Sequence, residues 1–338
     1  MADLTVAAGL ARGLMELAVS KGADPAELAR RSGIAPKLLE DQDNRIPFTT
    51  YVALMRAGKE LSGDPALALH YGETNDLSHI SIVGLIGYAS ETMMEAFAQL
   101  NRYGRLVVEF DGGPDRFRLE RDAAGLWIVD NRQNPNDFPE LTESTFARTI
   151  AGPRVFGVTQ LAKAVEVTHK APPYLDEYTR IYRAPVTFEA SRNAVLLDEK
   201  WTMHRIQLQP RYSFGILCEH ADALLKSLQA SKTTRGRVES LLMPILHTGN
   251  ASIDTIAGKM ALSRQTLFRK LKAEGVTFEK VLDELRHKLA LDYLRGKKVS
   301  VNETAYLVGF SDPAAFSRAF KRWTGKSPRA VRMSGSER

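Results

Sequence analysis

Two stretches near the C-terminus carry arginine and glutamine side chains at spacings that place them on one side of a helix. The first contains Arg264, Gln265 and Arg269, and the second contains Arg318. A guanidinium group makes paired hydrogen bonds to guanine or to phosphate, and a glutamine amide makes them to adenine. These residue types are therefore suited to contact nucleic acid.

The two stretches are copies of one pattern. Residues 252–257 resemble residues 300–305, and residues 261–263 match residues 309–311. Further along, Leu267, Arg269, Leu271, Lys272 and Gly275 match Phe316, Arg318, Phe320, Lys321 and Gly325. Each copy predicts two short helices separated by a tight turn, which is a helix-turn-helix.

Capping residues indicate where the helices begin and end. Ser263 is a suitable N-cap for the second helix of the first copy, and Gly275 ends that helix. In the second copy Gly309 suits a left-handed position after the first helix, and Asp312 and Pro313 suit the start of the second. The second helix of such a motif enters the major groove.

Position on this helix assigns roles in the first copy. We expect Arg264, Gln265 and Arg269 to read bases, and Lys270 and Lys272 to contact the phosphate backbone. In the second copy the first turn of the corresponding helix offers only Pro313, Ala314 and Ala315, whose side chains cannot hydrogen-bond a base. Arg318 is therefore expected to do most of the reading there, on a polar face that also carries Lys321 and Arg322. We expect the second copy to specify less sequence.

One longer helix is predicted between the copies, from Phe278 to Leu294, with Gly296 at its end. At 1.5 Å per residue it spans roughly 25 Å, which compares with about 34 Å for one turn of DNA. One chain can then read two adjacent major-groove segments on one face of DNA.

Charge is divided unequally along the chain. Residues 232–338 hold 21 Lys and Arg against 10 Asp and Glu, a net charge of +11, whereas residues 1–231 hold 25 against 30, a net charge of −5. A folded basic segment of this kind indicates a polyanionic partner. A hydrophobic fraction of 44% and a charged fraction of 25% are typical of globular proteins. We find neither a signal peptide nor an apolar run of membrane-spanning length, and expect a cytoplasmic protein.

Residues 252–332 resemble the DNA-binding domain of AraC/XylS-type transcription regulators. The motifs are the two helix-turn-helix units, a linker helix beginning near Arg286 and Ala290, and the terminal Gly325, Ser327, Pro328 and Arg332. The resemblance implies RNA polymerase as a partner and a groove-facing role for Arg264, Gln265, Phe268, Arg269, Pro313, Ala314 and Arg318. Two departures affect packing: His287 replaces an aliphatic residue and Val331 an aromatic one.

The N-terminal region predicts an α+β domain. Candidate helices occupy residues 6–20, 25–31, 48–61, 65–71 and 92–103. Candidate strands occupy residues 117–119, 126–129, 164–168, 186–189 and 195–197. The full prediction is an α+β sensing domain followed by an all-α domain with two helix-turn-helix units joined by a linker helix.

The order of features in residues 10 to 210 resembles the arabinose-binding type N-terminal domain of AraC-like regulators. Its landmarks are Pro47, the run from Gly63 to Leu67, Gly84, Gly87 and the helix around Ala96. The resemblance implies a domain that senses a small molecule and dimerises, without identifying the effector. No effector-binding residue is nominated. Six aromatic residues either line a pocket or belong to the core: Phe117, Trp127, Tyr174, Tyr178, Tyr182 and Trp201.

We predict no enzyme, no cofactor and no metal site. The histidines of the N-terminal region lack metal-ligand spacing, and neither a glycine-rich phosphate loop nor a Gly-x-Ser-x-Gly motif occurs. The single cysteine, Cys218, excludes disulfides within the chain and multi-cysteine metal sites. It is either a core residue or a redox sensor.

The predicted division is an effector-sensing domain at residues 1–228, a linker at 229–234 and a DNA-binding domain at 235–338. An apolar stripe from Ile216 to Leu228 either forms a homodimer face or packs on its own domain. The favoured function is a small-molecule-responsive transcription activator that binds double-stranded promoter DNA. Two alternatives are a non-specific architectural DNA-binding protein and a DNA-localised enzyme that uses Cys218.

Overall fold

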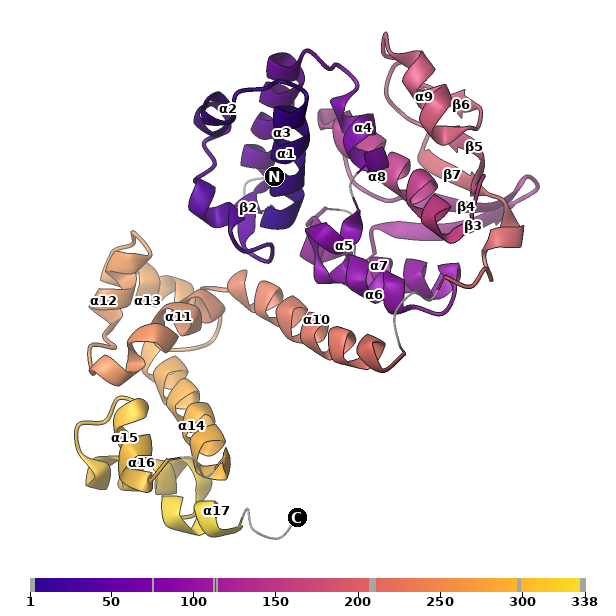
Figure 1. Ribbon diagram of the computed structural model, residues 1–338. Coiled ribbons are helices and arrows are strands. Elements are labelled where there is room, and N and C mark those ends of the chain that lie inside the picture. The colour runs from indigo at the N-terminus through magenta and orange to yellow at the C-terminus, as the bar shows by residue number, and fades with distance from the viewer. Residues whose placement is uncertain are drawn as a thin grey trace. The chain divides into compact units, whose positions relative to one another are not determined.

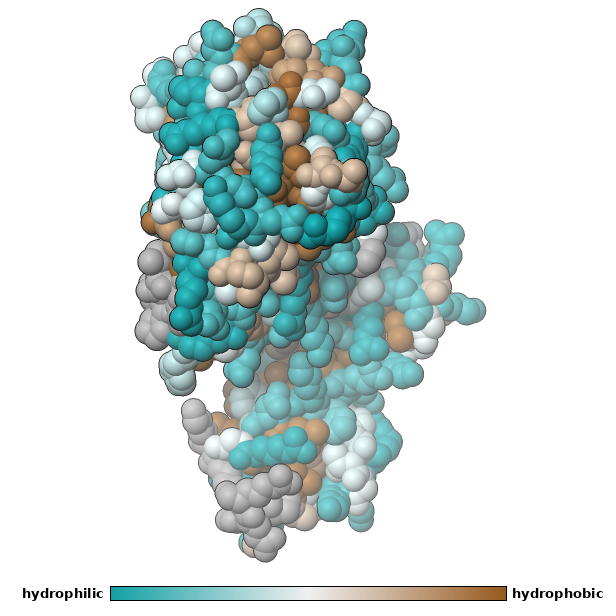
Figure 2. All heavy atoms as spheres, turned by 90° about the vertical axis from the view of Figure 1, so that its right-hand side faces the viewer, coloured by the Kyte–Doolittle hydropathy of each residue, from teal (hydrophilic) through white to brown (hydrophobic). Residues whose placement is uncertain are grey.

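In the computed structural model the chain forms two compact units, residues 1–225 and residues 226–338 (Figure 1). The structure describes residues 4–74, 76–111, 113, 115–206, 211–296 and 299–334. Within these ranges, no helix combines the length and apolar character needed to cross a membrane. On the face shown in Figure 2, hydrophilic side chains cover most of the N-terminal unit, and hydrophobic ones appear in small separate patches.

The N-terminal unit begins with helices packed around a short two-stranded sheet. Its elements are β1 (Thr5–Ala7), α1 (Ala8–Ser20), α2 (Pro25–Ser32), η1 (Pro36–Leu39), β2 (Arg45–Pro47) and α3 (Phe48–Ser62). The helix predicted from Val6 begins two residues later, because Val6 pairs with Ile46 in an antiparallel ladder. Asp24 caps α2 by accepting a hydrogen bond from the Glu27 amide.

Four helices follow: α4 (Leu67–Thr74), α5 (Leu77–Ile80), α6 (Ile82–Ala89) and α7 (Met93–Val107). Helix α4 begins two residues after the predicted Pro65, and α7 extends four residues beyond Tyr103. Thr92 caps α7 by accepting a hydrogen bond from the Glu95 amide. Helices α5 and α6 were not predicted, since α5 has only four residues and the sequence of α6 is almost uniformly apolar and shows no helical periodicity.

A five-stranded sheet with the order β3-β4-β7-β5-β6 forms the second half of the unit. The strands are β3 (Phe117–Asp122), β4 (Gly125–Asp130), β5 (Ala162–Glu166), β6 (Val186–Thr187) and β7 (Asn193–Leu197). All pairs are antiparallel except β5 with β6. The predicted strand at residues 186–189 is shortened to two residues. Ile128, Val165 and Val195 belong to the main core on one face of the sheet, whereas Trp127 and Val129 belong to a smaller cluster.

Helices α8 (Pro139–Ala151) and α9 (Leu175–Tyr182) contribute Phe146, Ile150 and Tyr178 to the same core as the sheet. Helix α8 also packs closely against α4. A Cβ at Gly72 of α4 would overlap the backbone carbonyl of Ser144, so the close approach requires glycine. This contact fixes the face of α8 that lines an interior cavity.

Helix α10 (Arg211–Ser231) continues from the first unit into the second. It is tied to α7 by hydrogen bonds from Tyr103 Oη and Arg102 Nη2 to Asp222, both 2.9 Å long. The predicted linker, residues 229–234, is largely helical: it comprises the last turn of α10, two intervening residues and the first residue of α11 (Thr234–Leu242). The polar composition that suggested an irregular linker is compatible with an exposed helix end.

The C-terminal unit is all helical, as predicted. After α11 it contains η5 (Met243–Thr248), α12 (Ile253–Lys259), α13 (Arg264–Ala273), α14 (Phe278–Gly296), α15 (Val301–Leu307), α16 (Pro313–Thr324) and α17 (Pro328–Ser334). Figure 1 shows α14 running between the pair α12–α13 and the pair α15–α16. The two pairs are the two helix-turn-helix units.

Helix α14 belongs to two hydrophobic cores. Phe278, Val281 and Leu285 pack in the core of the first helix-turn-helix unit, and Ala290 and Leu294 pack in the core of the second. Burial of large apolar side chains at both ends, at about 1.5–3 kcal/mol for each, holds the helix between the units. The two units therefore share one structural element and form a single body.

Arg286 joins α14 to the turn of the second unit. Its Nη2 donates to the Gly309 carbonyl at 3.0 Å, and its guanidinium lies 4.6 Å from the centre of the Phe310 ring. His287 packs against Phe320 and Trp323, with ring centres 6.3 and 5.7 Å apart. The departure from an aliphatic residue at this position is thus accommodated by aromatic packing.

Candidate functional sites

Each second helix of the two units begins with a side-chain cap, as the sequence predicts. Ser263 accepts a hydrogen bond from the Thr266 amide at 3.2 Å and starts α13. Asp312 accepts from the Ala314 and Ala315 amides at 2.9 and 3.0 Å and starts α16, with Pro313 in the first turn. The caps set which residues stand at the N-terminal end of each recognition helix.

Helix α13 buries one face and exposes the opposite one. Leu267 and Leu271 are almost fully buried, which turns the other side of the helix outward. All six residues predicted to contact DNA from this helix are exposed: Arg264, Gln265, Phe268, Arg269, Lys270 and Lys272. At 100° per residue, Gln265, Arg269 and Lys272 lie on the side opposite the buried leucines, whereas Lys270 lies on a flank. Arg264, expected on the same side as Gln265 and Arg269, lies instead closer to the leucine side, and it is exposed as the first residue of the helix.

Two features of this surface are relevant to binding. Phe268 is 50% exposed, which is unusual for a phenylalanine and leaves its ring available to a thymine methyl group. Arg264 Nη1 lies 3.2 Å from Asp254 Oδ2, and both side chains are more than 60% exposed. An exposed ion pair of this kind contributes about 0–1 kcal/mol, so Arg264 can exchange it for a phosphate or a base.

Helix α16 has a narrower polar face. Phe316 and Phe320 are fully buried, and the residues on the opposite side are Ala314, Arg318 and Lys321. Arg318 is 74% exposed and lies 3.9 Å from Asp312 in a weak pair. Pro313 is half-buried at the start of the helix. Arg318 and Lys321 are the long cationic side chains on this face.

Arg322 stands on a flank of α16. Its Nη2 donates to Asp283 Oδ2 of α14 at 3.1 Å, and Trp323 Nε1 donates to the same oxygen at 3.3 Å. Asp283 thus connects the linker helix to the second recognition helix. Arg322 has this structural partner in addition to its predicted role at the phosphate backbone.

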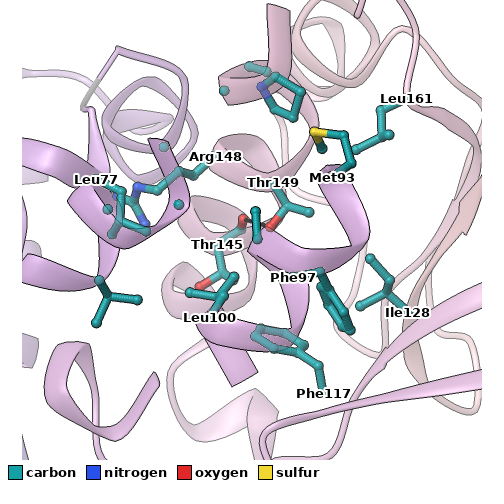
Figure 3. A pocket seen from close by; sticks show the side chains of 18 of the residues that line it. Leu77, Met93, Phe97, Leu100, Phe117, Ile128, Thr145, Arg148, Thr149 and Leu161 are labelled. Carbon is teal, nitrogen blue, oxygen red and sulfur yellow. Dashed lines mark hydrogen bonds between the residues drawn. The ribbon is translucent and has the colours of Figure 1, made fainter. Parts of the chain in front are cut away.

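The N-terminal unit contains a partly open cavity of about 320 Å³ between α5, α6, α7, α8 and the sheet. This volume is at the lower end of the range for small-molecule pockets. Figure 3 shows side chains from α7 and α8 facing each other across it. Its apolar wall includes Leu77, Met93, Phe97, Leu100, Phe117, Ile128 and Leu161.

Helix α8 supplies the polar part of the wall through Thr145, Arg148 and Thr149. Thr145 Oγ1 accepts a hydrogen bond from Arg116 Nη2 at 3.0 Å, and Thr149 Oγ1 donates to the Thr145 carbonyl at 2.8 Å. Among the described residues, Arg148 makes no hydrogen bond through its buried Nε and Nη2 atoms. The cavity is therefore apolar on one side and carries an arginine and two hydroxyls on the other.

A buried ion cluster lies beside this polar wall. Arg116 Nη2 and Arg132 Nε approach Asp130 Oδ2 at 3.3 and 3.0 Å. Burial alone would raise the pKa of Asp130, but the two guanidinium groups lower it. The carboxylate is therefore ionised, and it is shared between two cations.

The sequence did not identify this cavity. Of the aromatic residues considered for a pocket, Phe117 and Trp201 line it. Tyr174, Tyr178 and Tyr182 pack in or against the main core, and Trp127 lies in the smaller cluster beneath Arg192. Helix α8 was missed because buried polar residues interrupt its apolar periodicity: Thr142, Glu143, Ser144 and Thr145.

Cys218 of α10 is half-buried. Burial raises the pKa of its thiol, although Tyr103 opposes the shift. A raised pKa leaves less of the nucleophilic thiolate at neutral pH. This environment is unlike that of a reactive cysteine and does not favour the DNA-localised enzyme.

Comparison with known proteins assigns both units. Residues 22–206 match the family described as the arabinose-binding domain of AraC transcription regulator, and residues 256–334 match a helix-turn-helix domain family. The ornithine utilization regulator of Pseudomonas aeruginosa is 26% identical over 329 residues, which cover 94% of this chain and 93% of that protein.

Two further matches cover different shares of the chain. The transcriptional activator RhaS of Escherichia coli is 42% identical over 81 residues, 24% of this chain and 29% of that protein. The crystal structure of the transcriptional regulator CdpR from Pseudomonas aeruginosa aligns with 82% of this chain and 90% of that chain, with a TM-score of 0.38 and 23% identity.

Proposed function

Because this chain belongs to the AraC family of DNA-binding transcription regulators, we propose that it is a small-molecule-responsive activator that reads two adjacent major-groove segments of promoter DNA. The proposal adds to family membership the response to a small molecule, the positive sign of regulation and the mode of reading. It also assigns the base contacts to the exposed faces of α13 and α16.

The observation that carries the proposal is the pair of recognition helices attached to one linker helix. Each begins at a side-chain cap and exposes arginine on the face opposite its buried residues. Helix α14 packs in both cores, and its 19 residues span about 28 Å at 1.5 Å per residue. Such a body suits two neighbouring grooves on one face of DNA.

We divide the roles as the sequence suggests: residues 1–228 sense the effector, residues 229–234 join the domains, and residues 235–338 bind DNA. The cavity beneath α7 and α8 supports a sensing role, since it is closed on several sides and largely apolar. Effector binding must favour one arrangement of the chain over another, with a coupling free energy of about 1–3 kcal/mol.

The remaining partners are proposed on narrower grounds. Contact with RNA polymerase and a cytoplasmic location accord with activation at a bacterial promoter. Self-association through α10 is supported by two large apolar side chains that it exposes, Tyr212 at 81% and Ile216 at 52%. Ala221, further along the same helix, is buried and takes no part in this surface. Sedimentation velocity of the full chain tests self-association, and a monomer at all concentrations would exclude it.

The test of the proposed function is to map a tagged copy on its own genome by crosslinking and sequencing. An Arg269→Ala, Arg318→Ala double variant is mapped in parallel. The matched control is Arg30→Ala, Arg121→Ala, which removes two exposed arginines of the N-terminal unit and changes net charge equally. We expect sharp peaks upstream of genes that persist in the control and disappear in the double variant.

Other outcomes distinguish the alternatives. Diffuse occupancy that falls uniformly in the double variant would indicate an architectural protein, because phosphate contacts carry no sequence information. Sharp peaks that survive in the double variant would place the base-reading residues elsewhere. Transcript levels of the neighbouring genes in a deletion strain then decide the sign of regulation.

A further inference from the structure

We propose that the cavity of the N-terminal unit binds an organic anion, a carboxylate joined to an apolar body, with Arg148 as its counter-ion. The inference rests on the proposed function only in treating the cavity as the effector site. It names the chemical class of effector.

The first observation is the state of Arg148. Its Nε and Nη2 atoms are buried and have no hydrogen-bond partner among the described residues. Its guanidinium carbon lies 5.1 Å from the centre of the Tyr71 ring. A cation–π contact compensates only part of the lost hydration, and an uncompensated buried charge is unfavourable. The folded chain therefore carries a cation that an anionic ligand would satisfy.

The acidic groups of the cavity wall are already engaged. Glu73 pairs with Arg180 at 2.6 Å, Asp76 caps α5 through the Ser78 amide at 2.8 Å, and Asp198 pairs with Lys200 at 2.7 Å. The neighbouring Arg116 shares Asp130 with Arg132. Arg116 and Arg148 line this part of the wall, and Asp130, the carboxylate beside Arg116, is already shared with Arg132, so the wall here has excess positive charge and favours an anion.

The arrangement of side chains orients such a ligand. In Figure 3, Arg148 extends from α8 toward Leu77, Thr145 and Thr149 lie in the middle, and Phe97, Phe117 and Ile128 lie at the other side. A carboxylate beside Arg148 would leave the body of the ligand against the aromatic side. The threonine hydroxyls flank the path between the two ends.

The same lining disfavours a sugar. Thr149 Oγ1 already donates to a backbone carbonyl, and Thr145 Oγ1 already accepts from Arg116. Few polar groups remain for a ring of hydroxyls, and each hydroxyl left unpaired against the apolar wall weakens binding. The name of the matched domain family therefore does not describe the ligand that this cavity suits.

The experiment compares carboxylates with uncharged amides of the same shape on the full-length chain. The probes are octanoate with octanamide, and 3-phenylpropionate with 3-phenylpropionamide, at millimolar concentration. Isothermal calorimetry and the midpoint of thermal unfolding report binding. We expect at least one carboxylate to bind about tenfold or more tightly than its amide, as a charged hydrogen-bond pair implies.

Arg148→Met tests the counter-ion. We expect this variant to bind acid and amide equally and to have an unliganded midpoint no lower than wild type, since it removes an unpaired buried charge. Arg148→Lys keeps the charge and should retain part of the preference. The control is Arg192→Met, because Arg192 also stacks on an aromatic ring, Trp127 at 4.4 Å, but lies outside the cavity.

Three results would overturn the inference: no binding of either carboxylate, equal binding of acid and amide to the wild-type chain, or an unchanged preference in Arg148→Met. A large drop in the unliganded midpoint of Arg148→Met would instead assign Arg148 a structural role. DNA binding of the same preparations is measured separately. Weaker binding of Arg269→Ala to the specific site upholds the DNA-reading part of the proposed function whatever the carboxylates do.

Discussion

The two helix-turn-helix units share the order helix, turn, helix but have different surfaces. The turn between the helices contains a left-handed residue in both, Ala261 with a φ of 53° and Gly309 with a φ of 81°. The first recognition helix exposes Arg264, Gln265 and Arg269, whereas the second exposes alanine before Arg318. Repetition of the fold therefore does not imply repetition of base reading.

The units also differ in how their helices begin. Ser252 and Ser263 cap the helices of the first unit with hydroxyl groups. In the second unit Asp312 caps α16, and Ser300 caps α15 together with Glu303 in a capping box. Asp254 lies in the first turn of α12, but among the described caps of the four motif helices carboxylates take part only in those of α15 and α16, so the two units should respond differently to acid.

The largest expected effect comes from exchanging the residues of the two turns. A Cβ at position 309 would overlap the Leu246 carbonyl, and the backbone there is left-handed, which disfavours any residue with a Cβ. We expect Gly309→Ala to lower the free energy of unfolding of the C-terminal unit by about 2–4 kcal/mol. Urea unfolding followed by circular dichroism, compared with wild type, measures the change.

The reciprocal substitution sharpens the same comparison. Ala261 is exposed and already left-handed, so Ala261→Gly relieves strain and should raise the free energy of unfolding by up to about 1 kcal/mol. Gly275→Ala is the control, because it has a φ of 73° but no atom near its Cβ position. A smaller loss in Gly309→Ala than in Gly275→Ala would show that the close approach to Leu246 is unimportant.

The next effect concerns base reading by individual residues. We expect Arg269→Ala and Arg318→Ala each to weaken binding to the specific site by about 1–3 kcal/mol, each at a different half of the site. Fluorescence anisotropy with DNA substituted at single positions measures the loss. We propose three base-reading side chains in the first unit and one in the second. Arg318→Ala should therefore abolish base discrimination in its half of the site, whereas Arg269→Ala should only reduce it.

A matched charge change serves as the reference for that measurement. Lys272→Ala should weaken binding to specific and unrelated DNA equally and reduce the salt dependence by about one phosphate contact. If Arg318→Ala behaved like Lys272→Ala, the second unit would contribute only backbone contacts.

The smallest effect is expected on acidification. Hydrogen bonds from the Ser300 backbone lower the pKa of Glu303, and those from the Ala314 and Ala315 amides lower the pKa of Asp312. A carboxyl group whose pKa is lowered by folding stabilises the fold at any pH above its ordinary pKa, which is 4.5 for Glu303 and 3.8 for Asp312. This stabilisation is lost as the pH falls below those values. As the pH is lowered, amide hydrogen exchange corrected for intrinsic rates should therefore show that α15 and α16 lose protection at a higher pH than α12 and α13.

A double substitution provides the check. Glu303→Gln with Asp312→Asn keeps both capping geometries without a titrating group. In that variant the difference between the units below about pH 4.5 should disappear. Glu274 of the first unit also has a lowered pKa, since the Arg235 and Thr234 amides offset its burial, but it caps α11 rather than α12 or α13.

Much of the C-terminal unit could be predicted from the sequence because its signals are local. Caps at Ser263 and Asp312, the left-handed Gly309 and the apolar periodicity of α14 each depend on a few neighbouring residues. The exposure of all the predicted contact residues except the half-buried Pro313 follows from the same periodicity. Which bases they contact depends on DNA and stays a prediction.

The cavity could not be predicted because its signals are not local. Helix α8 is buried on several sides and includes polar residues whose partners lie far along the chain, such as Glu143, which accepts from Tyr178 at 2.5 Å. Arg148 looks like any surface arginine in the sequence. Its importance comes from Tyr71, from α7 and from the sheet, which are brought around it only by tertiary packing.

The packing of α14 in the cores of both helix-turn-helix units has a consequence for promoter architecture. One inserted base pair between the two half-sites moves the second half by about 3.4 Å along the DNA and rotates it by about 35°. A flexible tether would absorb that displacement, but a helix anchored by Leu285 in one core and Leu294 in the other cannot. Spacer length within the operator should therefore be as strictly selected as the bases themselves.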